Sequence, residues 1–321
     1  MRAFLKYAAF CVASLAAPAA FATCGAAFCT VNTNWDAHGA WSGPGWRLDL
    51  RYESITQDQP QSGSDRVSVG QIPRHHDEVF TRNRNWVATV DYTFNADWGV
   101  SFTLPYVDRN HFHIHNHRGA QIPGSWDFSA AGDARLLARY RLGTFEDRDP
   151  PKLATVGMIF GLKLPTGPID VRNANGELAE RTLQPGTGTT DALLGAYYAQ
   201  LLPSTDLSWF VQGMIQAPVN SRDGFKPGQR FSLDVGLRYD ATEKVSLMLQ
   251  ANGLYRGRDA GVNAEPEDSG GKSWFLSPGV NVGLTRDVGL YGFYQIPIYQ
   301  FVNGVQLTAR SGWLVGLGAR F

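Results

Sequence analysis

The stretch RFSLDVGLRYD, residues 230–240, alternates strictly between apolar and polar side chains. One face of such a strand would carry Phe231, Leu233, Val235, Leu237 and Tyr239, and the other Ser232, Asp234, Gly236, Arg238 and Asp240. Successive side chains of a β-strand point to opposite faces, so the stretch predicts a strand with one apolar face. Ionised groups persist to the middle of the other face, where a packed core would not accept them unpaired.

Similar segments of about ten residues recur along the chain, among them WRLDLRYE (46–53) and DARLLARYR (133–141). Strands are expected at 45–57, 79–95, 99–108, 132–143, 152–166, 189–202, 207–219, 229–241, 245–259, 272–286, 288–302 and 305–321. Short connections such as NADWG and TRDVG alternate with long ones at 58–78, 109–131, 168–188, 219–229 and 260–271. This pattern is typical of outer-membrane barrels, which have short periplasmic turns and longer external loops.

The predicted fold class is therefore all-β: one closed antiparallel transmembrane β-barrel of about twelve strands, of the bacterial outer-membrane type. High glycine (35 residues), 12% aromatics and only 18% charged residues suit such a chain. A soluble β-sandwich is the alternative. The 29 basic and 29 acidic residues balance, so nothing indicates a nucleic-acid partner, which would require a basic excess.

The N-terminal region predicts export. Basic residues precede a short apolar run that ends at Ala20-Phe21-Ala22, which indicates a cleaved signal peptide over residues 1–22. A lipoprotein acylated at Cys24 is the weaker alternative. Residues 23–44 are expected to form a periplasmic N-terminal segment, and residues 45–321 the barrel. The final strand ends on Phe321, the residue expected to contact the barrel-assembly machinery, with outer-membrane lipid around the wall.

Two cysteines remain after the predicted cleavage, in the stretch CGAAFC. Disulfides form and persist in exported proteins, so Cys24 and Cys29 are expected to be joined. A thiolate metal site or a redox switch are the alternatives.

Six histidines gather in two places, PRHHDEV before the second predicted strand and HFHIHNH after the third. Those strands would form a hairpin, and a turn centred on Asp97 sets His113 opposite Thr81 and His115 opposite Val79. The odd-numbered histidines would then face the lumen. The predicted ligands of Zn²⁺, Cu²⁺ or Ni²⁺ are His75, His76, Asp77, His111, His113, His115 and His117. The alternatives are a pH gate and a polar loop with histidines by chance.

Inward-facing charges form a second group. The predicted pore-lining residues are Arg47, Asp49, Arg51, Glu53, Asp91, Arg135, Arg139, Arg141, Lys163, Asp191, Asp234, Arg238 and Arg256. They could equally form a salt-bridged network that fills a narrow barrel. The acidic loop AEPEDSGG (264–271) could bind a hard cation or simply be solvated.

The stretches GLKLPTG (161–167) and LQPGTGTTDALLG (183–195) resemble the outer-membrane transporter family named for phenol meta-cleavage operons. In that family a K-L-P-T-G strand end is followed by a G-T-G…D strand start. The resemblance covers about 35 residues of this chain. It implies a bacterial outer-membrane barrel with a transport role and does not imply a substrate.

The predicted function is an outer-membrane channel or transporter whose His-rich external mouth binds transition metal. A channel for small aromatic or other organic solutes is one alternative. A metal-sensing or structural barrel that transports nothing is the other. No enzyme is predicted, because the chain has no G-x-S-x-G elbow and its clustered histidines would face the lumen.

Overall fold

The computed structural model describes residues 27, 29–33, 44–73, 75–117, 120–148 and 151–321. The strands are β1 (Gly45–Gly63), β2 (Asp65–Arg66), β3 (Asp77–Thr93), β4 (Trp98–His117), β5 (Ala120–Ala131), β6 (Arg135–Arg148), β7 (Pro151–Lys163), β8 (Asp191–Leu202), β9 (Leu207–Pro218), β10 (Arg230–Asp240), β11 (Val245–Arg256), β12 (Gly271–Gly283) and β13 (Val288–Arg320). A short 3₁₀ turn, η2 (Pro203–Thr205), joins β8 to β9.

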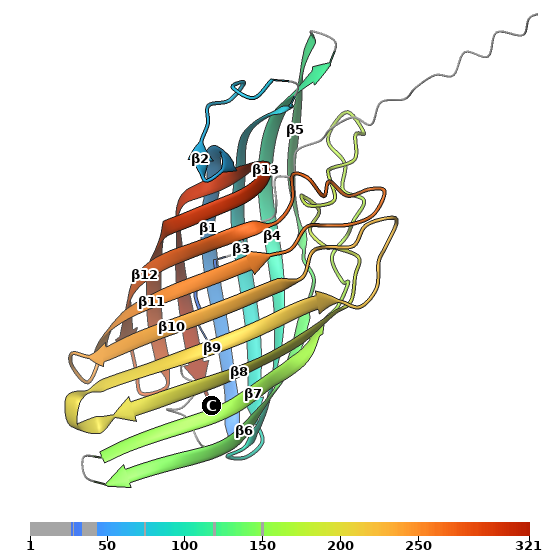
Figure 1. Cartoon of the computed structure of the whole chain (residues 1–321). Helices are drawn as coiled ribbons and strands as arrows, with labels where there is room; N and C mark the ends of the chain where they lie inside the picture. Colours follow the sequence, from blue (N-terminus) through green and yellow to red (C-terminus); the bar gives the residue numbers. More distant parts are fainter. Residues whose placement is uncertain (1–26, 28, 34–43, 74, 118–119, 149–150) are drawn as a thin grey trace, which may run out of the picture.

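All pairings between these strands are antiparallel, and the sheet closes because β13 pairs with β1 (Figure 1). The first half of β13 pairs with β12 as far as Val302, and the second half pairs with β1 from Val302 onward. The chain therefore reverses direction beside Gly304, which has a left-handed φ of 59°. Eleven labelled strands of the described chain form the wall, and the two passes of β13 give the predicted twelve crossings.

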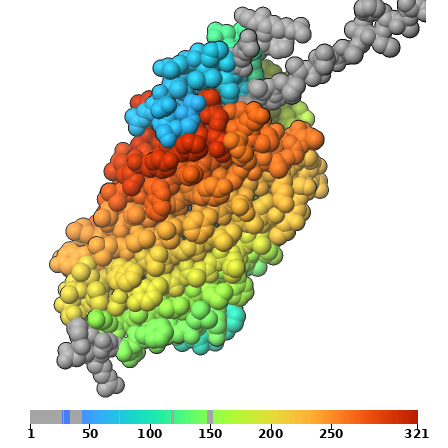
Figure 2. Space-filling view, in the orientation of Figure 1, coloured from blue at the N-terminus to red at the C-terminus, as the bar shows by residue number. Residues whose placement is uncertain are grey.

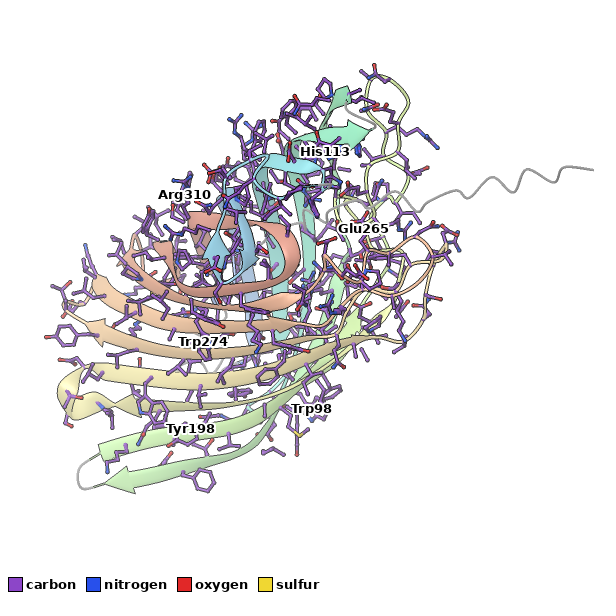
Figure 3. All side chains as sticks on the ribbon, turned by 45° about the horizontal axis from the view of Figure 1, so that its top comes forward. Trp98, His113, Tyr198, Glu265, Trp274 and Arg310 are labelled. Atoms are coloured by element: carbon purple, nitrogen blue, oxygen red, sulfur yellow. The ribbon has the colours of Figure 1, made fainter. Side chains whose placement is uncertain are left out.

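The outer surface of the barrel is apolar, as the alternation in β10 predicts. Phe231, Val235, Leu237 and Tyr239 are exposed, while Asp234 between them is buried. Trp98 and Trp274 lie on the same outer surface (Figure 3). Figure 2 shows consecutive strands as oblique bands across this face. Among the described residues, no helix is long and apolar enough to cross a membrane.

Two strands lie outside the closed wall. β2 is a short addition to β1, and β5 pairs only with the outer half of β4, from Tyr106 to His117. β6 takes over as the neighbour of β4 at its lower end, from Trp98 to Thr103. β4 and β5 therefore rise above the wall as a hairpin (Figure 1), where the sequence predicted a long loop over 109–131.

The described residues of the predicted periplasmic segment lie inside the barrel. The Cys29 amide donates to Glu53 (3.1 Å), and the Asn32 amide donates to Gln250 (3.0 Å), which donates back to the Asn32 carbonyl (2.9 Å). Gln295 donates to Thr30 (2.6 Å), and Asn85 donates to the Ala27 carbonyl (3.0 Å). These partners belong to β1, β3, β11 and β13, so residues 27 and 29–33 occupy the lumen. The signal-peptide boundary stays a prediction.

The KLPTG and GTGTTD stretches meet at one buried ion-pair network. Lys163 binds Asp133 (2.7 Å) and the Thr189 carbonyl (2.8 Å), and lies 3.4 Å from Asp191. Asp133 also accepts hydrogen bonds from the amides of Gly167 and Thr187. A Cβ at Gly186 would lie 2.2 Å from the Gly167 carbonyl oxygen, so only glycine fits there. The network fixes both ends of the loop over residues 164–190.

Candidate metal centre at the outer mouth

The outward side chains of β3 and β4 show where the apolar belt ends. Trp86 and Tyr106 are exposed and apolar, whereas the next outward pair, Arg84 and Asp108, forms an exposed salt bridge of 3.0 Å. Charged groups are costly on a lipid-facing surface. Residues beyond this pair, including His111 and His113, therefore lie outside the membrane-spanning part of the wall.

A β-bulge decides which carboxylate faces the histidines. Below the bulge, Thr81 pairs with His111, and above it Glu78 pairs with His113, so Val79 is the extra residue. The insertion reverses the alternation: Glu78 turns inward and is 2% exposed, although its even number predicts an outward position. The register predicted from the sequence placed His113 opposite Thr81. It was wrong by two residues along β4, because His111 lies opposite Thr81.

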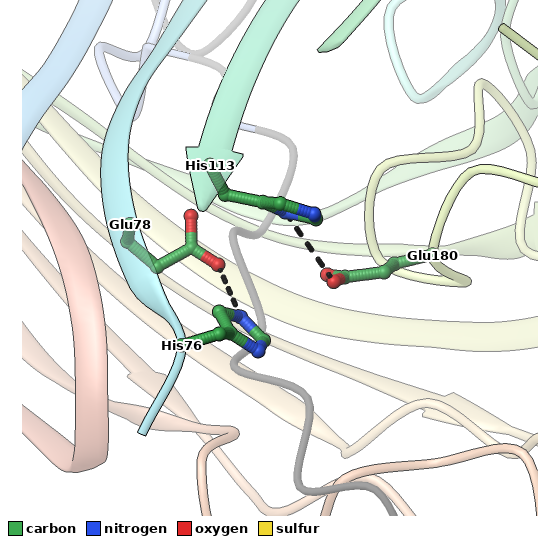
Figure 4. A group of neighbouring side chains, drawn as sticks. All are labelled: His76, Glu78, His113 and Glu180. Atoms are coloured by element: carbon green, nitrogen blue, oxygen red, sulfur yellow. Dashed lines mark hydrogen bonds and ion pairs between the residues drawn. The ribbon is translucent and has the colours of Figure 1, made fainter. Parts of the chain in front are cut away.

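Four side chains converge beyond the bulge: His76, Glu78, His113 and Glu180 (Figure 4). Each offers a nitrogen or oxygen ligand atom, and these atoms lie within 4.8 Å of one another. His76 Nε2 is 2.8 Å from Glu78 Oε1, and His113 Nδ1 is 3.8 Å from Glu180 Oε1. A tetrahedral Zn²⁺ with bonds of about 2.0–2.2 Å holds its ligand atoms roughly 3.4 Å apart. Small side-chain movements would therefore suffice to close the four groups around an ion.

The three described alternating histidines form a chain of close contacts on the lumenal side of β4. His111 Nε2 is 3.0 Å from His113 Nδ1, and His113 Nε2 is 2.8 Å from His115 Nε2. Thr81 Oγ1 lies 2.9 Å from His111 Nδ1, which fixes the first ring. Because His113 is fully buried at the centre, its neighbours orient its ring toward the other three groups.

Burial keeps the central imidazoles neutral. Burial, reinforced by the nearby His111, His115 and His76, lowers the pKa of His113 to about 2. Burial likewise lowers the pKa values of His111 and His115. A neutral imidazole has a free lone pair, which metal coordination requires. At neutral pH, His111, His113 and His115 are therefore in the form that can bind metal.

Glu180 comes from the loop over residues 164–190 and reaches the strands from above. Its side chain is 13% exposed, and neither of its carboxylate oxygens accepts a hydrogen bond from a described residue. Burial raises its pKa well above the ordinary value, and the charges of Glu78 and Glu265 raise it further. A buried carboxylate without hydrogen bonds is costly, and a bound cation would compensate for it.

The loop is held in place independently of Glu180. Trp126 donates to the Glu177 carbonyl (3.2 Å), and Arg109, which is fully buried, donates to the Leu183 carbonyl. Trp126, Ala179, Leu183 and Leu307 pack as one buried apolar cluster. The backbone on both sides of Glu180 is thus anchored, and this anchoring positions the carboxylate.

The remaining predicted ligands lie apart from these four groups. His75 pairs with Asp268 of the acidic loop, at 3.4 Å. Asp77 lies above the bulge opposite Ile114 and accepts a hydrogen bond from Asn116 (3.1 Å), so the bulge turns it away. His117 ends β4, and its side chain lies outside the described part of the structure.

Cys29 has a free, buried thiol beside the Trp313 carbonyl. No described residue forms a disulfide with Cys29. Its intended partner, Cys24, lies outside the described residues. The disulfide between the two cysteines therefore stays a prediction.

The predicted pore-lining charges occupy inward positions, and most of them form ion pairs with one another or with neighbouring acidic residues. Arg47 lies 3.8 Å from Asp49 and 3.7 Å from Asp91, and Arg51 lies 2.8 Å from Glu53. Further ion pairs of this group are Arg141–Asp97, Lys163–Asp133, Lys163–Asp191, Arg238–Asp240 and Arg256–Asp259. At the periplasmic end, Arg47 and Arg238 line a cavity of about 630 Å³.

Sequence reasoning missed two of the four converging residues. Glu78 follows the HHD stretch directly, but its face depends on the bulge. Glu180 lies 67 positions after His113 in a loop without regular alternation. The KLPTG and GTG stretches flank the loop of Glu180 and mark where its two ends are fixed, but they do not indicate which loop residue reaches the histidines.

The fold has a known counterpart. The chain is similar to the COG4313 outer membrane channel from Pseudomonas putida F1, with a TM-score of 0.67 and 14% identity over 91% of this chain and 99% of that one. The NanC porin gives a TM-score of 0.44 at 9% identity, covering 85% and 100% of the two chains. A FadL homologue from Pseudomonas aeruginosa gives 0.38 at 11% identity, covering 87% and 90%. No protein-family model and no curated protein match the sequence. The first likeness establishes an outer-membrane barrel fold.

Proposed function

We propose that the protein is a bacterial outer-membrane channel whose outer mouth binds a transition-metal ion through His76, Glu78, His113 and Glu180. The convergence of these four groups beyond the apolar belt carries the proposal. Two imidazole nitrogens and two carboxylate oxygens match the preferences of Zn²⁺, and imidazoles also suit Cu²⁺ and Ni²⁺. The ion would be captured at the mouth and then pass along the charged lumen.

The structural similarity to the P. putida protein supports the channel role, because that protein is described as an outer membrane channel. The resemblance to the transporter family of phenol meta-cleavage operons favours a second candidate, a channel for small organic solutes. The lumenal position of residues 29–33 favours a third, because a filled lumen suits a metal-sensing or structural barrel that transports nothing.

Two measurements on the purified barrel separate the three candidates. Calorimetry with Zn²⁺, Cu²⁺ and Ni²⁺ measures binding, and liposome swelling with and without the bound ion measures solute flux. Metal binding together with metal-dependent flux supports the first candidate. Flux of organic solutes without metal binding supports the second, and metal binding without any flux supports the third. If His113→Ala binds metal as tightly as the wild type, the metal assignment is wrong.

A further inference from the structure

His111 lies beside the four converging groups as a further nitrogen donor. Its Nε2 atom is 3.0 Å from His113 Nδ1 and 3.8 Å from Glu78 Oε2, and both of these partners belong to the metal centre. The ring of His111 is fully buried and packs against Trp126, with 5.9 Å between the ring centroids. An ion held by His113 and Glu78 would therefore lie within reach of His111.

Hydrogen bonds determine which nitrogens of these rings can bind an ion. Burial lowers the pKa values of His111, His113 and His115, so each ring carries one N–H and one lone pair. His111 Nδ1 lies 2.9 Å from Thr81 Oγ1, and His113 Nε2 lies 2.8 Å from His115 Nε2. A metal-bound imidazole typically donates its other N–H to a nearby acceptor, and both outer nitrogens have one. With the protons there, the lone pairs of His111 Nε2 and His113 Nδ1 face each other, an arrangement that a cation between them stabilises.

The spacing of the donors favours right-angled coordination. Imidazole bonds of about 2.0–2.1 Å that meet at a right angle place their donor atoms about 2.8–3.0 Å apart, whereas tetrahedral coordination separates them by roughly 3.4 Å. The separation of His111 Nε2 from His113 Nδ1 is 3.0 Å, and that of His76 Nε2 from Glu78 Oε1 is 2.8 Å. Nitrogen and oxygen donors in a tetragonal arrangement suit Cu²⁺ or Ni²⁺, and a given set of donors binds Cu²⁺ more tightly than Ni²⁺.

We propose that the metal centre binds Cu²⁺ with His111 as a further ligand, and that His111 provides selectivity for Cu²⁺ over Zn²⁺. The inference rests on the proposed metal-binding function. His111 Nε2 and His113 Nδ1 occupy adjacent corners of a square plane. Glu78 and Glu180 supply the other two corners, through carboxylate oxygens that lie 3.8 Å from these nitrogens and close in by side-chain rotation. His76, beside Glu78 Oε1, is the axial ligand.

Affinities for Cu²⁺ and Zn²⁺ test the role of His111. Isothermal calorimetry on the purified full-length barrel, with a competing chelator of known affinity, measures both ions. His111→Ala should weaken Cu²⁺ binding at least about tenfold and leave Zn²⁺ affinity within about threefold, because tetrahedral Zn²⁺ keeps four ligands. His75→Ala is the matched control. It removes a histidine of the same cluster whose Nε2 faces Asp268, and it should change neither affinity.

The electron spin echo of bound Cu²⁺ gives a second readout, because its modulation counts the equatorial imidazoles. The wild type should show two. His111→Ala should show one, whereas His76→Ala should still show two because His76 is axial. Thr81→Val serves where His111→Ala does not assemble into a barrel. It removes the acceptor of the His111 N–H and should weaken Cu²⁺ binding about tenfold while Zn²⁺ binding stays unchanged.

The possible failures are distinguishable. Two equatorial imidazoles in His111→Ala, or equal losses of Cu²⁺ and Zn²⁺ affinity in that variant, overturn the role of His111 while the metal centre itself stands. Where Thr81→Val takes its place, equal losses of the two affinities have the same meaning. A wild type that binds neither ion overturns the proposed metal-binding function, and this inference with it.

Discussion

Glu180 Oε1 lies 3.8 Å from His113 Nδ1. His113 belongs to β4, whereas Glu180 lies in the loop between β7 and β8, so β5, β6 and β7 separate the two residues along the chain. The contact brings an otherwise unsatisfied carboxylate to a neutral imidazole. Metal affinity should therefore depend on a residue outside the histidine-rich stretch.

Replacing Glu180 with Gln should weaken Zn²⁺ binding by on the order of 100-fold, since loss of a ligand costs at least as much as loss of its supporting groups. Glu177→Gln is the control, because Glu177 lies in the same loop but is exposed. Isothermal calorimetry measures both affinities. Equal affinities in the two variants would remove Glu180 from the metal centre.

The pH dependence of metal binding should follow Glu180 more than His113. The pKa of Glu180 is raised, so in the metal-free protein it keeps its proton above the ordinary carboxyl range, and binding must displace that proton. Affinity should accordingly increase as pH rises through this range. His113, whose pKa is lowered to about 2, has no proton to release. Calorimetry in buffers of different ionisation enthalpy counts the protons, and Glu180→Gln should release fewer than the wild type.

Deleting Val79 should leave metal binding intact, because Glu78 then directly precedes Phe80 and stays on the lumenal face opposite His113. Glu78→Gln in the full-length chain should instead weaken metal binding, since it replaces a carboxylate ligand with an amide. Metal titration and circular dichroism of the same preparations separate loss of the ligand from loss of the barrel. Binding by Glu78→Gln as tight as that of the wild type would show that Glu78 is not a ligand.

Replacing residues 27–33 with a flexible linker of equal length should raise single-channel conductance. Residues 29–33 lie in the lumen through hydrogen bonds to Glu53, Gln250 and Gln295. A glycine–serine linker would lack most of the side chains that fill this space. The equal length keeps the connection to β1 unchanged. Planar bilayer recordings test the expectation, and an unaltered conductance would mean that the segment does not limit flow.

Lys163→Met should destabilise the barrel by about 3–5 kcal/mol, because it leaves two buried carboxylates without their cation. Asp133 and Asp191 both face the Lys163 ammonium group. Lys226→Met, at an exposed position, should change stability little. Equilibrium unfolding in urea compares the two. A small effect at Lys163 would show that the network does not hold the loop ends.

The alternation of apolar and polar residues predicted most of the wall, because in β10 and its neighbours one face contacts lipid and the other the polar lumen. It also placed His111 and His113 correctly on the lumenal side, where both are fully buried. Parity could not reveal the bulge at Val79, since an inserted residue leaves no mark on the pattern around it. The alternation also failed to predict β5. This strand pairs with the part of β4 that lies outside the membrane, where a strand needs no apolar face.

Glu180 and Asn32 were beyond prediction for a different reason. Each is placed by partners distant in the chain: Glu180 by its loop's packing on Trp126, and Asn32 by a pair of hydrogen bonds with Gln250, 218 positions away. Periodicity describes only neighbours along a strand. It carries no information on which irregular segments fold back over or into the barrel.

The seam between β1 and β13 imposes an order on assembly. It joins the first and last strands of the wall, so it can form only after the whole barrel sequence has been synthesised. Residues 29–33 precede β1 and end up encircled by the wall. They must be enclosed as the seam zips shut or be threaded into a finished cylinder afterwards. If the wall closes around the segment, the segment does not have to pass through a narrow opening. The last strands can then align on the segment as the seam forms.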